Sequence, residues 1–294
     1  MKYKNQINKL LTAIWLIVLC IVSYIVLKDL PPDFFSWENI DYTRAGLGIV
    51  TGMIFSLPLV WIVRDYLVKK IKYSWFISFI LIFLPAIAKY IPGKIWSFLG
   101  FLLQAKNMAN ISEKDASFFQ VYNQIIGLLS SVLLTIIGIT TINSIKNSQL
   151  LFYFNVGAII LLLASVFAIY MLIKISNNYN HKINKSRIIP HITALSIQKI
   201  LKGLSLVLFL SAFIPIHDFI FEIMLAFIIA MQMGVLAFFA PAGLGITEGA
   251  YVMLLSDHFT LAVAIQIAIL ARIWQTILDF LLAIIGFILK LILF

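Results

Sequence analysis

Long runs of apolar residues separated by short polar stretches are the dominant pattern of the chain. Residues 10–27, 45–63, 118–142 and 151–173 are almost entirely apolar. A helix needs about 20 such residues to cross the hydrocarbon core of a bilayer. The pattern therefore predicts an all-α, polytopic integral membrane protein that crosses the bilayer several times.

Two further apolar segments are interrupted near their middle by Pro and Gly. In residues 73–105 the stretch KYIPGK (89–94) separates two runs that are too short to be two spans. Residues 64–72 before this segment are basic, and counting the spans back from the basic stretch 174–202 places residues 106–115 on the same face. We therefore expect a re-entrant helical hairpin with Pro92 and Gly93 at its tip. Residues 219–255 are broken in the same way by PAGLG (241–245), which predicts a second re-entrant hairpin. The alternative is a full span over 219–240, which is long enough to cross the bilayer.

The order of these elements indicates an internal repeat. Pro92 and Pro241 are 149 positions apart (241 − 92), close to half of the 294 residues. A span, a broken hairpin and a span occur in residues 45–142 and again in 196–294, and the loop charges give the two copies opposite directions. We therefore predict inverted repeats. The last apolar run, 260–294, exceeds one upright span, and we expect one long tilted helix or a span with an interfacial tail.

Broken helices inside a membrane indicate a binding site. Their free N–H and C=O groups survive only when they are packed in protein or line a watery cavity. Inverted repeats with interrupted helices place substrates near the midplane of the bilayer. The helix N-termini at the breaks favour an anionic group there. The alternative is that Pro and Gly only kink ordinary membrane helices.

Composition agrees with a membrane protein and excludes most soluble classes. Of the 294 residues, 62% are hydrophobic and 12% are charged, whereas a soluble chain averages about 25% charged residues. Mean hydropathy is +1.04. A soluble globule could not cover so much apolar surface with polar groups. We expect a single membrane domain over residues 1–294.

The charged residues indicate which loops face the cytoplasm. The net charge is +10, and cytoplasmic loops of membrane proteins carry such a basic excess. Residues 174–202 contain six basic residues and no acid, whereas 28–44 contain four acids. This predicts a basic cytoplasmic linker at 174–202, a cytoplasmic N-terminus and a plasma-membrane location. Because the basic residues are divided among short loops, we expect no nucleic-acid partner.

A few charged residues fall within or beside the apolar segments, where charge is costly. Lys89 and Lys94 flank the first break and could hold a phosphate or carboxylate, or could extend to the interface. Glu248 follows the second break, as a counter-ion, a proton carrier or a charge at a helix N-terminus. Arg272 and Asp279 share one helix face, and Arg272 could pair with Asp279 or with Glu248.

Enzymatic chemistry finds no support in the sequence. The four histidines, His181, His191, His217 and His258, have no metal-ligand spacing and lie in loops or at span ends. No Ser/His/Asp set or phosphate-binding Gly loop is present in the sequence. We therefore expect no catalytic residue, no metal and no cofactor. A membrane-embedded transferase would have only Glu248 and Asp279 as a base.

The two breaks resemble the signatures of a known family. KYIPGK at 89–94 is similar to the K-Y-x-P-G motif of the lysylphosphatidylglycerol synthase transmembrane family, and PAGLGITEG at 241–249 is similar to its P-G-G-x-G-x-R-E-G motif. Arg272 lies where that family often has an arginine. Ala242 stands in place of a glycine and Thr247 in place of a basic residue.

The resemblance implies a flippase-like, stand-alone member without the aminoacyl-transfer domain, which would move a lipid and not synthesise it. The expected function is translocation of a phospholipid or polyprenyl-phosphate-linked head group through a midplane cavity. The alternative is a non-transporting partner that presents a lipid-linked sugar to a glycosyltransferase. Expected partners are anionic or polyprenyl-phosphate-linked lipids, a glycosyltransferase and a second copy of the chain. The expected substrate-binding residues are Lys89, Tyr90, Pro92, Gly93, Lys94, Pro241, Gly243, Gly245, Glu248, Arg272 and Asp279.

Overall fold

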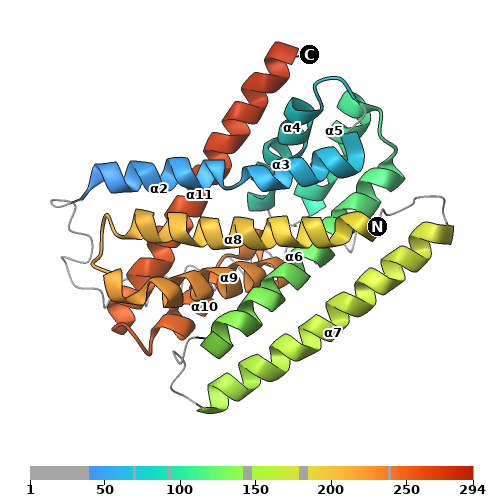
Figure 1. The fold of residues 1–294 in the computed structure, drawn as a ribbon. Helices are drawn as coiled ribbons and strands as arrows, with labels where there is room; N and C mark the ends of the chain where they lie inside the picture. Colours follow the sequence, from blue (N-terminus) through green and yellow to red (C-terminus); the bar gives the residue numbers. More distant parts are fainter. Residues whose placement is uncertain are drawn as a thin grey trace, which may run out of the picture.

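The computed structural model describes residues 40–68, 71–91, 95–141, 148–178, 185–237 and 240–293. Every regular element in this part of the chain is helical (Figure 1), which confirms the predicted all-α class. The first span expected at 10–27 and the tip residues Pro92, Gly93 and Lys94 lie outside the described residues. The stretches that are long and apolar enough to cross a membrane are Tyr42–Val68, Glu113–Gly138, Val156–Ile175, Lys185–Leu210 and Leu261–Leu293. These stretches indicate a multi-pass membrane protein.

Long helices form the frame of the bundle, and shorter helices lie between them. The long helices are α2 (Tyr42–Ile54) with α3 (Leu57–Val63), α6 (Glu113–Thr141), α7 (Ser148–Asn178), α8 (Ile188–Leu210) and α11 (Leu261–Leu293). The shorter helices are α4 (Ser74–Ala86), α5 (Ile95–Ala109), α9 (Ile220–Leu236) and α10 (Ile246–Leu255). Brief π or 3-10 turns join them: η1 (Arg64–Val68), η2 (Ile87–Tyr90), η3 (Lys185–Arg187), η4 (His217–Phe219) and η5 (Pro241–Gly243).

The last apolar run is one continuous helix from Leu261 to Leu293. Helix α11 has 33 residues, or about 50 Å at 1.5 Å per residue. It crosses the direction of α2 and α8 at a steep angle and extends past the other helices at its C-terminal end (Figure 1). A helix of this length exceeds the roughly 30 Å hydrocarbon core, and tilting is one way for a bilayer to accommodate it.

Helices α2, α8 and α11 meet at the small residues of α2. A Cβ on Gly48 would lie 2.6 Å from the backbone nitrogen of Phe209 on α8. The Gly48 carbonyl oxygen accepts hydrogen bonds from Ser205 Oγ at 2.6 Å and from Trp274 Nε1 on α11 at 3.1 Å. Small residues let membrane helices approach closely and bond through their backbones.

We expect Gly48→Ala to destabilise the protein by about 1–3 kcal/mol, because the added methyl group would force α2 and α8 apart. The matched control is Gly46→Ala on the same helix, where an added Cβ meets no atom within 4 Å. Thermal unfolding in detergent would measure both variants. Equal melting temperatures for the two variants would contradict the close contact.

Helices α4 and α5 form a short packed pair that starts and ends at the same end of the bundle. They have 13 and 15 residues, or about 20 and 23 Å, short of the roughly 30 Å hydrocarbon core. Arg64 Nε donates to Ser74 Oγ at 3.0 Å, so α4 starts beside η1. After α5 the chain returns to η1, where the rings of Tyr66 and Phe119 on α6 are 5.2 Å apart.

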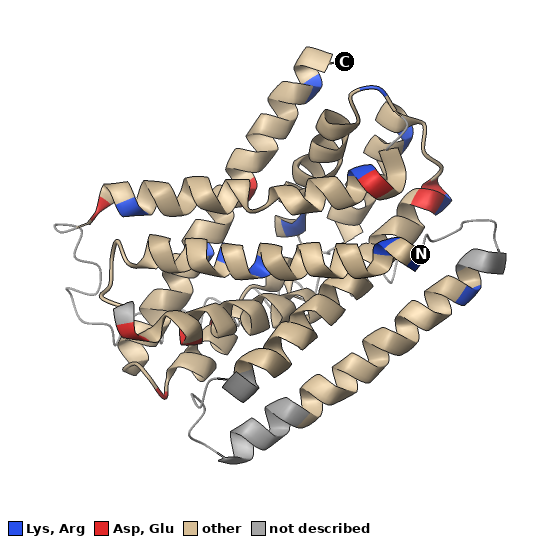
Figure 2. Ribbon diagram, in the orientation of Figure 1, with Lys and Arg blue, Asp and Glu red and all other residues tan. Residues whose placement is uncertain are grey.

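Helices α9 and α10 form a second short pair at the opposite end. The ring of Phe219, just before α9, lies 4.8 Å from that of Phe259, just after α10. Helix α8 joins the two ends, because Arg187 lies 3.5 Å from Asp65 in η1 and the Ala212 carbonyl accepts a hydrogen bond from the backbone of Asp41. Most charged residues lie near these two ends, with few between them (Figure 2).

The basic linker expected at 174–202 is largely helical. Helix α7 extends to Asn178, and α8 begins at Ile188. Pro190 lies in the first turn of α8, where its missing N–H does not interrupt the helix. Lys199 and Lys202 therefore lie well inside α8 and not in a loop. The sequence pattern joined them to the linker because no polar break separates them from the basic residues before.

Candidate functional site

The breaks of the two short pairs lie side by side on α11. The 3-10 turn η2, at the first break, contacts η5 at the second break, and η2 also contacts α11. Helix α11 packs along both α4 and α10. The sequence predicted that the two breaks would meet, and the described part of each break does so.

Asp279 on α11 holds the first break through several bonds. Its Oδ2 atom lies 2.6 Å from Lys89 Nζ and accepts a hydrogen bond from the Tyr90 hydroxyl at 2.7 Å. Its other oxygen accepts from Gln275 Nε2 at 3.0 Å. Two consecutive residues of η2 are therefore fixed to one carboxylate of α11.

Arg272, two turns earlier on α11, holds the second break. Its Nη1 atom donates to the carbonyl oxygen of Ala242 at 2.9 Å, and its Nε atom lies 3.5 Å from Glu248 Oε1. The other oxygen of Glu248 accepts the backbone N–H of Gly245 at 2.7 Å. Glu248 thus acts both as a helix N-terminal charge and as the partner of Arg272. Of the two partners weighed for Arg272, the structure selects Glu248.

Tyr90 connects the contacts of Asp279 with those of Arg272. The four charged side chains of these contacts all remain partly exposed. The Arg272 guanidinium lies 5.7 Å from the centre of the Tyr90 ring, within cation–π range. The side chains of Lys89 and Glu248 are 31% and 24% exposed, and those of Arg272 and Asp279 are 15% and 12% exposed. Arg272 Nη2 is buried without a hydrogen-bond partner among the described residues.

Sequence reasoning missed Lys202 as a member of this group. Its ammonium lies 5.7 Å from the Trp274 ring on α11 and close enough to Asp279 to act on its charge. With Lys202 the group has three cations and two carboxylates, Lys89, Lys202, Arg272, Glu248 and Asp279, a net charge of +1 (3 − 2). Such an excess favours an anion. The signal available in the sequence was a lysine immediately before an uninterrupted apolar run.

The backbone of the second break is tightly bent. Ala242, Gly243 and Gly245 all have positive φ angles, of 48°, 74° and 80°. An added Cβ on Gly243 would lie 2.7 Å from the Cα of Gly234 on α9. Only glycine fits at position 243, both for its backbone conformation and for the space around it.

We expect Gly243→Ala to destabilise the protein by about 1–3 kcal/mol, because the strained backbone and the contact with Gly234 both oppose a methyl group. Gly249→Ala on α10 is the control, since an added Cβ there meets no atom within 4 Å. Melting temperatures in the same detergent would compare them. A Gly243→Ala protein as stable as Gly249→Ala would show that the turn is not built as described.

The structure places eight of the eleven predicted site residues at or beside the two breaks. Five of them carry the contacts: Lys89, Tyr90, Glu248, Arg272 and Asp279. Pro241, Gly243 and Gly245 shape the second turn, whereas Pro92, Gly93 and Lys94 lie outside the described residues. The described residues contain no cluster of three or more His, Cys, Asp or Glu side chains that could hold a metal ion.

Comparison with known proteins adds no relative: no family model matches the chain, and no curated protein and no solved structure matches it. The resemblance of the two breaks to the lysylphosphatidylglycerol synthase transmembrane family therefore stays a prediction.

Proposed function

We propose that the protein is a lipid translocase that moves a phosphate-bearing lipid head group across the membrane. The observation that carries this proposal is the meeting of two helix breaks at a partly exposed group of ions on α11. The lipid tails would stay in the bilayer while the head passes the breaks.

The internal ion pairs give the site a way to release its ligand. A charge inside the membrane costs roughly 2.5–3.5 kcal/mol without a partner. A lipid phosphate that binds Lys89 takes the place of Asp279, and one that binds Arg272 takes the place of Glu248. When the lipid leaves, each cation returns to its carboxylate, so the cations have a partner in both states. While the lipid is bound, Asp279 keeps the hydrogen bonds from Tyr90 and Gln275, and Glu248 keeps the one from the Gly245 N–H.

The packing of the helices supports inverted repeats around this site. Helix α4 packs against α11, and its counterpart α9 packs against α6. In the same way, α5 packs against α6 as α10 packs against α11. Helix α3 packs against α4 as α8 packs against α9. Two equivalent halves around one site can alternate in opening it to the two faces of the bilayer.

Transport can be measured in liposomes that contain the purified protein and a fluorescent phospholipid. A quencher added outside reports how fast the label crosses, with anionic, zwitterionic and polyprenyl-phosphate lipids tested in turn. We expect at least one phosphate-bearing lipid to cross faster than in empty liposomes. Lys89→Met should slow the crossing of this lipid at least tenfold, which corresponds to about 1.4 kcal/mol of activation free energy.

Lys106→Met is the matched control for Lys89→Met. Lys106 is also a paired lysine, 2.7 Å from Glu113, but its side chain is 59% exposed. The Lys106→Met variant should transport lipid at the wild-type rate. The proposal would be wrong if no lipid of the panel crossed faster with the protein than without it.

A further inference from the structure

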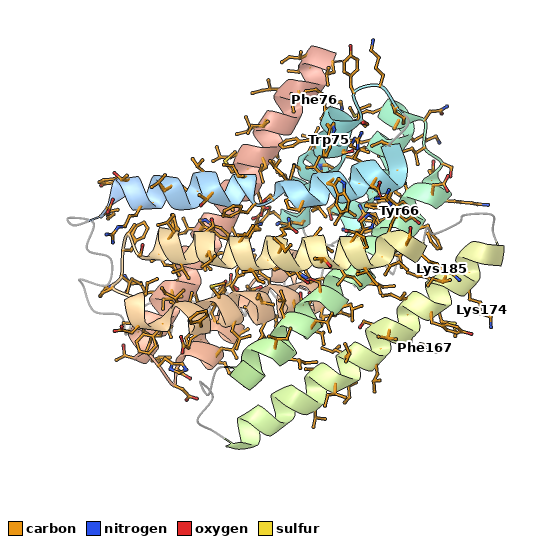
Figure 3. All side chains as sticks on the ribbon, viewed as in Figure 1. Tyr66, Trp75, Phe76, Phe167, Lys174 and Lys185 are labelled. Carbon is orange, nitrogen blue, oxygen red and sulfur yellow. The ribbon has the colours of Figure 1, made fainter. Side chains whose placement is uncertain are left out.

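A second group of ionisable side chains lies at the end of the bundle that holds η1 and the start of α8. We call this the basic end, because Arg64, Lys72, Lys185 and Arg187 lie there. Figure 3 shows Tyr66 and Lys185 at this end, near the start of α8. His191 lies 11 residues before Lys202, about 16 Å along α8, so this group is separate from the site on α11. Its members come from η1, α6, η3 and α8: Asp65, Tyr66, Asp115, Tyr122, Arg187 and His191.

His191 is at the centre of this group and is almost completely buried, with 1% of its side chain exposed. Its Nδ1 atom is 2.8 Å from the hydroxyl of Tyr122. Its Nε2 atom lies 3.4 Å from Asp65 Oδ2 and makes no hydrogen bond within the described residues. Trp61 covers the ring edge-on at 5.2 Å. Such an incompletely bonded buried nitrogen needs an explanation.

The positions of Asp65 and Tyr122 indicate where a proton would bind on the His191 ring. Because Nε2 faces a carboxylate, the neutral ring carries its hydrogen there, and Nδ1 accepts a hydrogen bond from Tyr122. A second proton would bind Nδ1, and the Tyr122 hydroxyl would turn to accept a hydrogen bond from it, as a phenol can both donate and accept. The charged ring would then form an ion pair with Asp65.

Arg187 competes with His191 for the same carboxylate oxygen. Its Nε atom lies 3.5 Å from Asp65 Oδ2, and its side chain is 39% exposed. When His191 is neutral, Asp65 and Arg187 balance each other. When His191 gains a charge, the two cations repel each other, and Arg187 is the one that can move into water. Its departure would release η3, which leads directly into α8, from η1.

The shape of η1 fits a moving contact. It is a π-helix over Arg64–Val68 that continues α3. Single turns of π-helix are rare and occur frequently at functional sites. The charge of His191 therefore acts where the two long membrane segments α3–η1 and α8 are joined at the basic end.

We propose that Asp65 and His191 form a proton-binding site, and that the proton is the ion that drives lipid transport; the second half rests on the proposed function. Helix α8 links the two processes, because it carries His191 at one end and Lys202 beside Asp279 further along. The proton enters from the water at the end of the bundle that holds η1, and for a gradient to drive the lipid it leaves to the water on the opposite face when the ring becomes neutral again.

The proton site can be tested without transport. In the full chain with His181→Asn, His217→Asn and His258→Asn, His191 is the remaining histidine. Nitrogen NMR of labelled histidine in lipid nanodiscs should show a neutral ring with hydrogen on Nε2 that becomes charged as the pH is lowered from about 8 to about 4.

Adding Asp65→Asn should lower the ratio of charged to neutral ring at least about tenfold at the pH of half-conversion. A ring that never becomes charged in this range, or a ratio that Asp65→Asn does not change, would overturn the proton site. Thermal unfolding of the Asp65→Asn protein would show that it is still folded.

Coupling is tested in liposomes with and without a difference of about one pH unit across the membrane, a factor of about ten in proton activity. The wild type should transport lipid up to about tenfold faster with the gradient, and His191→Gln should give a ratio of one. His258→Gln, at the other end of the bundle, should respond as the wild type does.

Equal rates with and without the gradient in the wild type would overturn proton coupling and leave lipid transport standing. Absence of lipid transport under every gradient would overturn the proposed function and the coupling together. The NMR experiment would then still decide whether Asp65 and His191 bind a proton.

Discussion

Asp279→Ala is expected to slow lipid transport at least tenfold and to lower the free energy of unfolding by about 3 kcal/mol. The change removes the partner of Lys89, of the Tyr90 hydroxyl and of Gln275 at once. The Lys89 ammonium then loses its counter-ion, and Tyr90 in η2 keeps one longer hydrogen bond to α11, to Thr276 at 3.4 Å. Thermal unfolding and the liposome assay would measure the two effects.

A double variant separates stability from function. Lys89→Met with Asp279→Leu removes both charges and replaces them with apolar groups, which is often neutral or stabilising in buried pairs. We therefore expect this protein to melt close to the wild type but to transport no faster than Asp279→Ala. Recovery of transport together with stability would show that the pair is only structural.

Arg272→Ala is expected to release the second break and also to abolish most transport. The variant loses a charged hydrogen bond to the Ala242 carbonyl and the contact with Glu248. Hydrogen bonds to charged groups contribute about 1.5–3 kcal/mol, so unfolding should become easier by that amount. Transport should fall at least tenfold, because the cation that would receive the lipid phosphate is gone.

Two controls belong with Arg272→Ala. Arg44→Ala removes an arginine whose pair with Asp41 is about half exposed, and such surface pairs contribute at most about 1 kcal/mol. Arg272→Lys keeps the charge, but a lysine cannot reach two partners in fixed directions as a guanidinium does. We therefore expect the transport rate of Arg272→Lys to be closer to that of Arg272→Ala than to that of the wild type. Full activity of Arg272→Lys would show that charge alone matters there.

The membrane architecture was largely predictable because it depends on local features. The length of an apolar run decides whether a helix can cross the bilayer, and α6, α8 and α11 follow from it. Pro92 lies outside the described residues, but the turns beside it and at Pro241 occur where Pro and Gly interrupt the runs. Helix α8 began earlier than expected because Pro190 does not end a helix in its first turn.

The pairing of Asp279 with the first break could not be predicted, because it joins residues far apart in the sequence. Asp279 accepts a hydrogen bond from Tyr90, 189 positions earlier. The sequence placed Asp279 and Arg272 on one face of a helix and offered Asp279 or Glu248 as the partner of Arg272. In the folded chain Asp279 contacts the first break and Arg272 contacts the second. Lys202 and His191 were assigned to a loop or a span end by the charge pattern, although both are inside α8.

We expect the two short helix pairs to enter the membrane from opposite faces, and each pair to leave on the face that it entered. Single cysteines at Lys72, Ser112, Asp218 and Ser256, all exposed in the structure, can be introduced after Cys20→Ser. A maleimide that cannot cross the membrane is then applied to one side of sealed vesicles. We predict that positions 72 and 112 react from one side, and that 218 and 256 react from the other. Labelling of 72 and 112 from opposite sides would contradict the account.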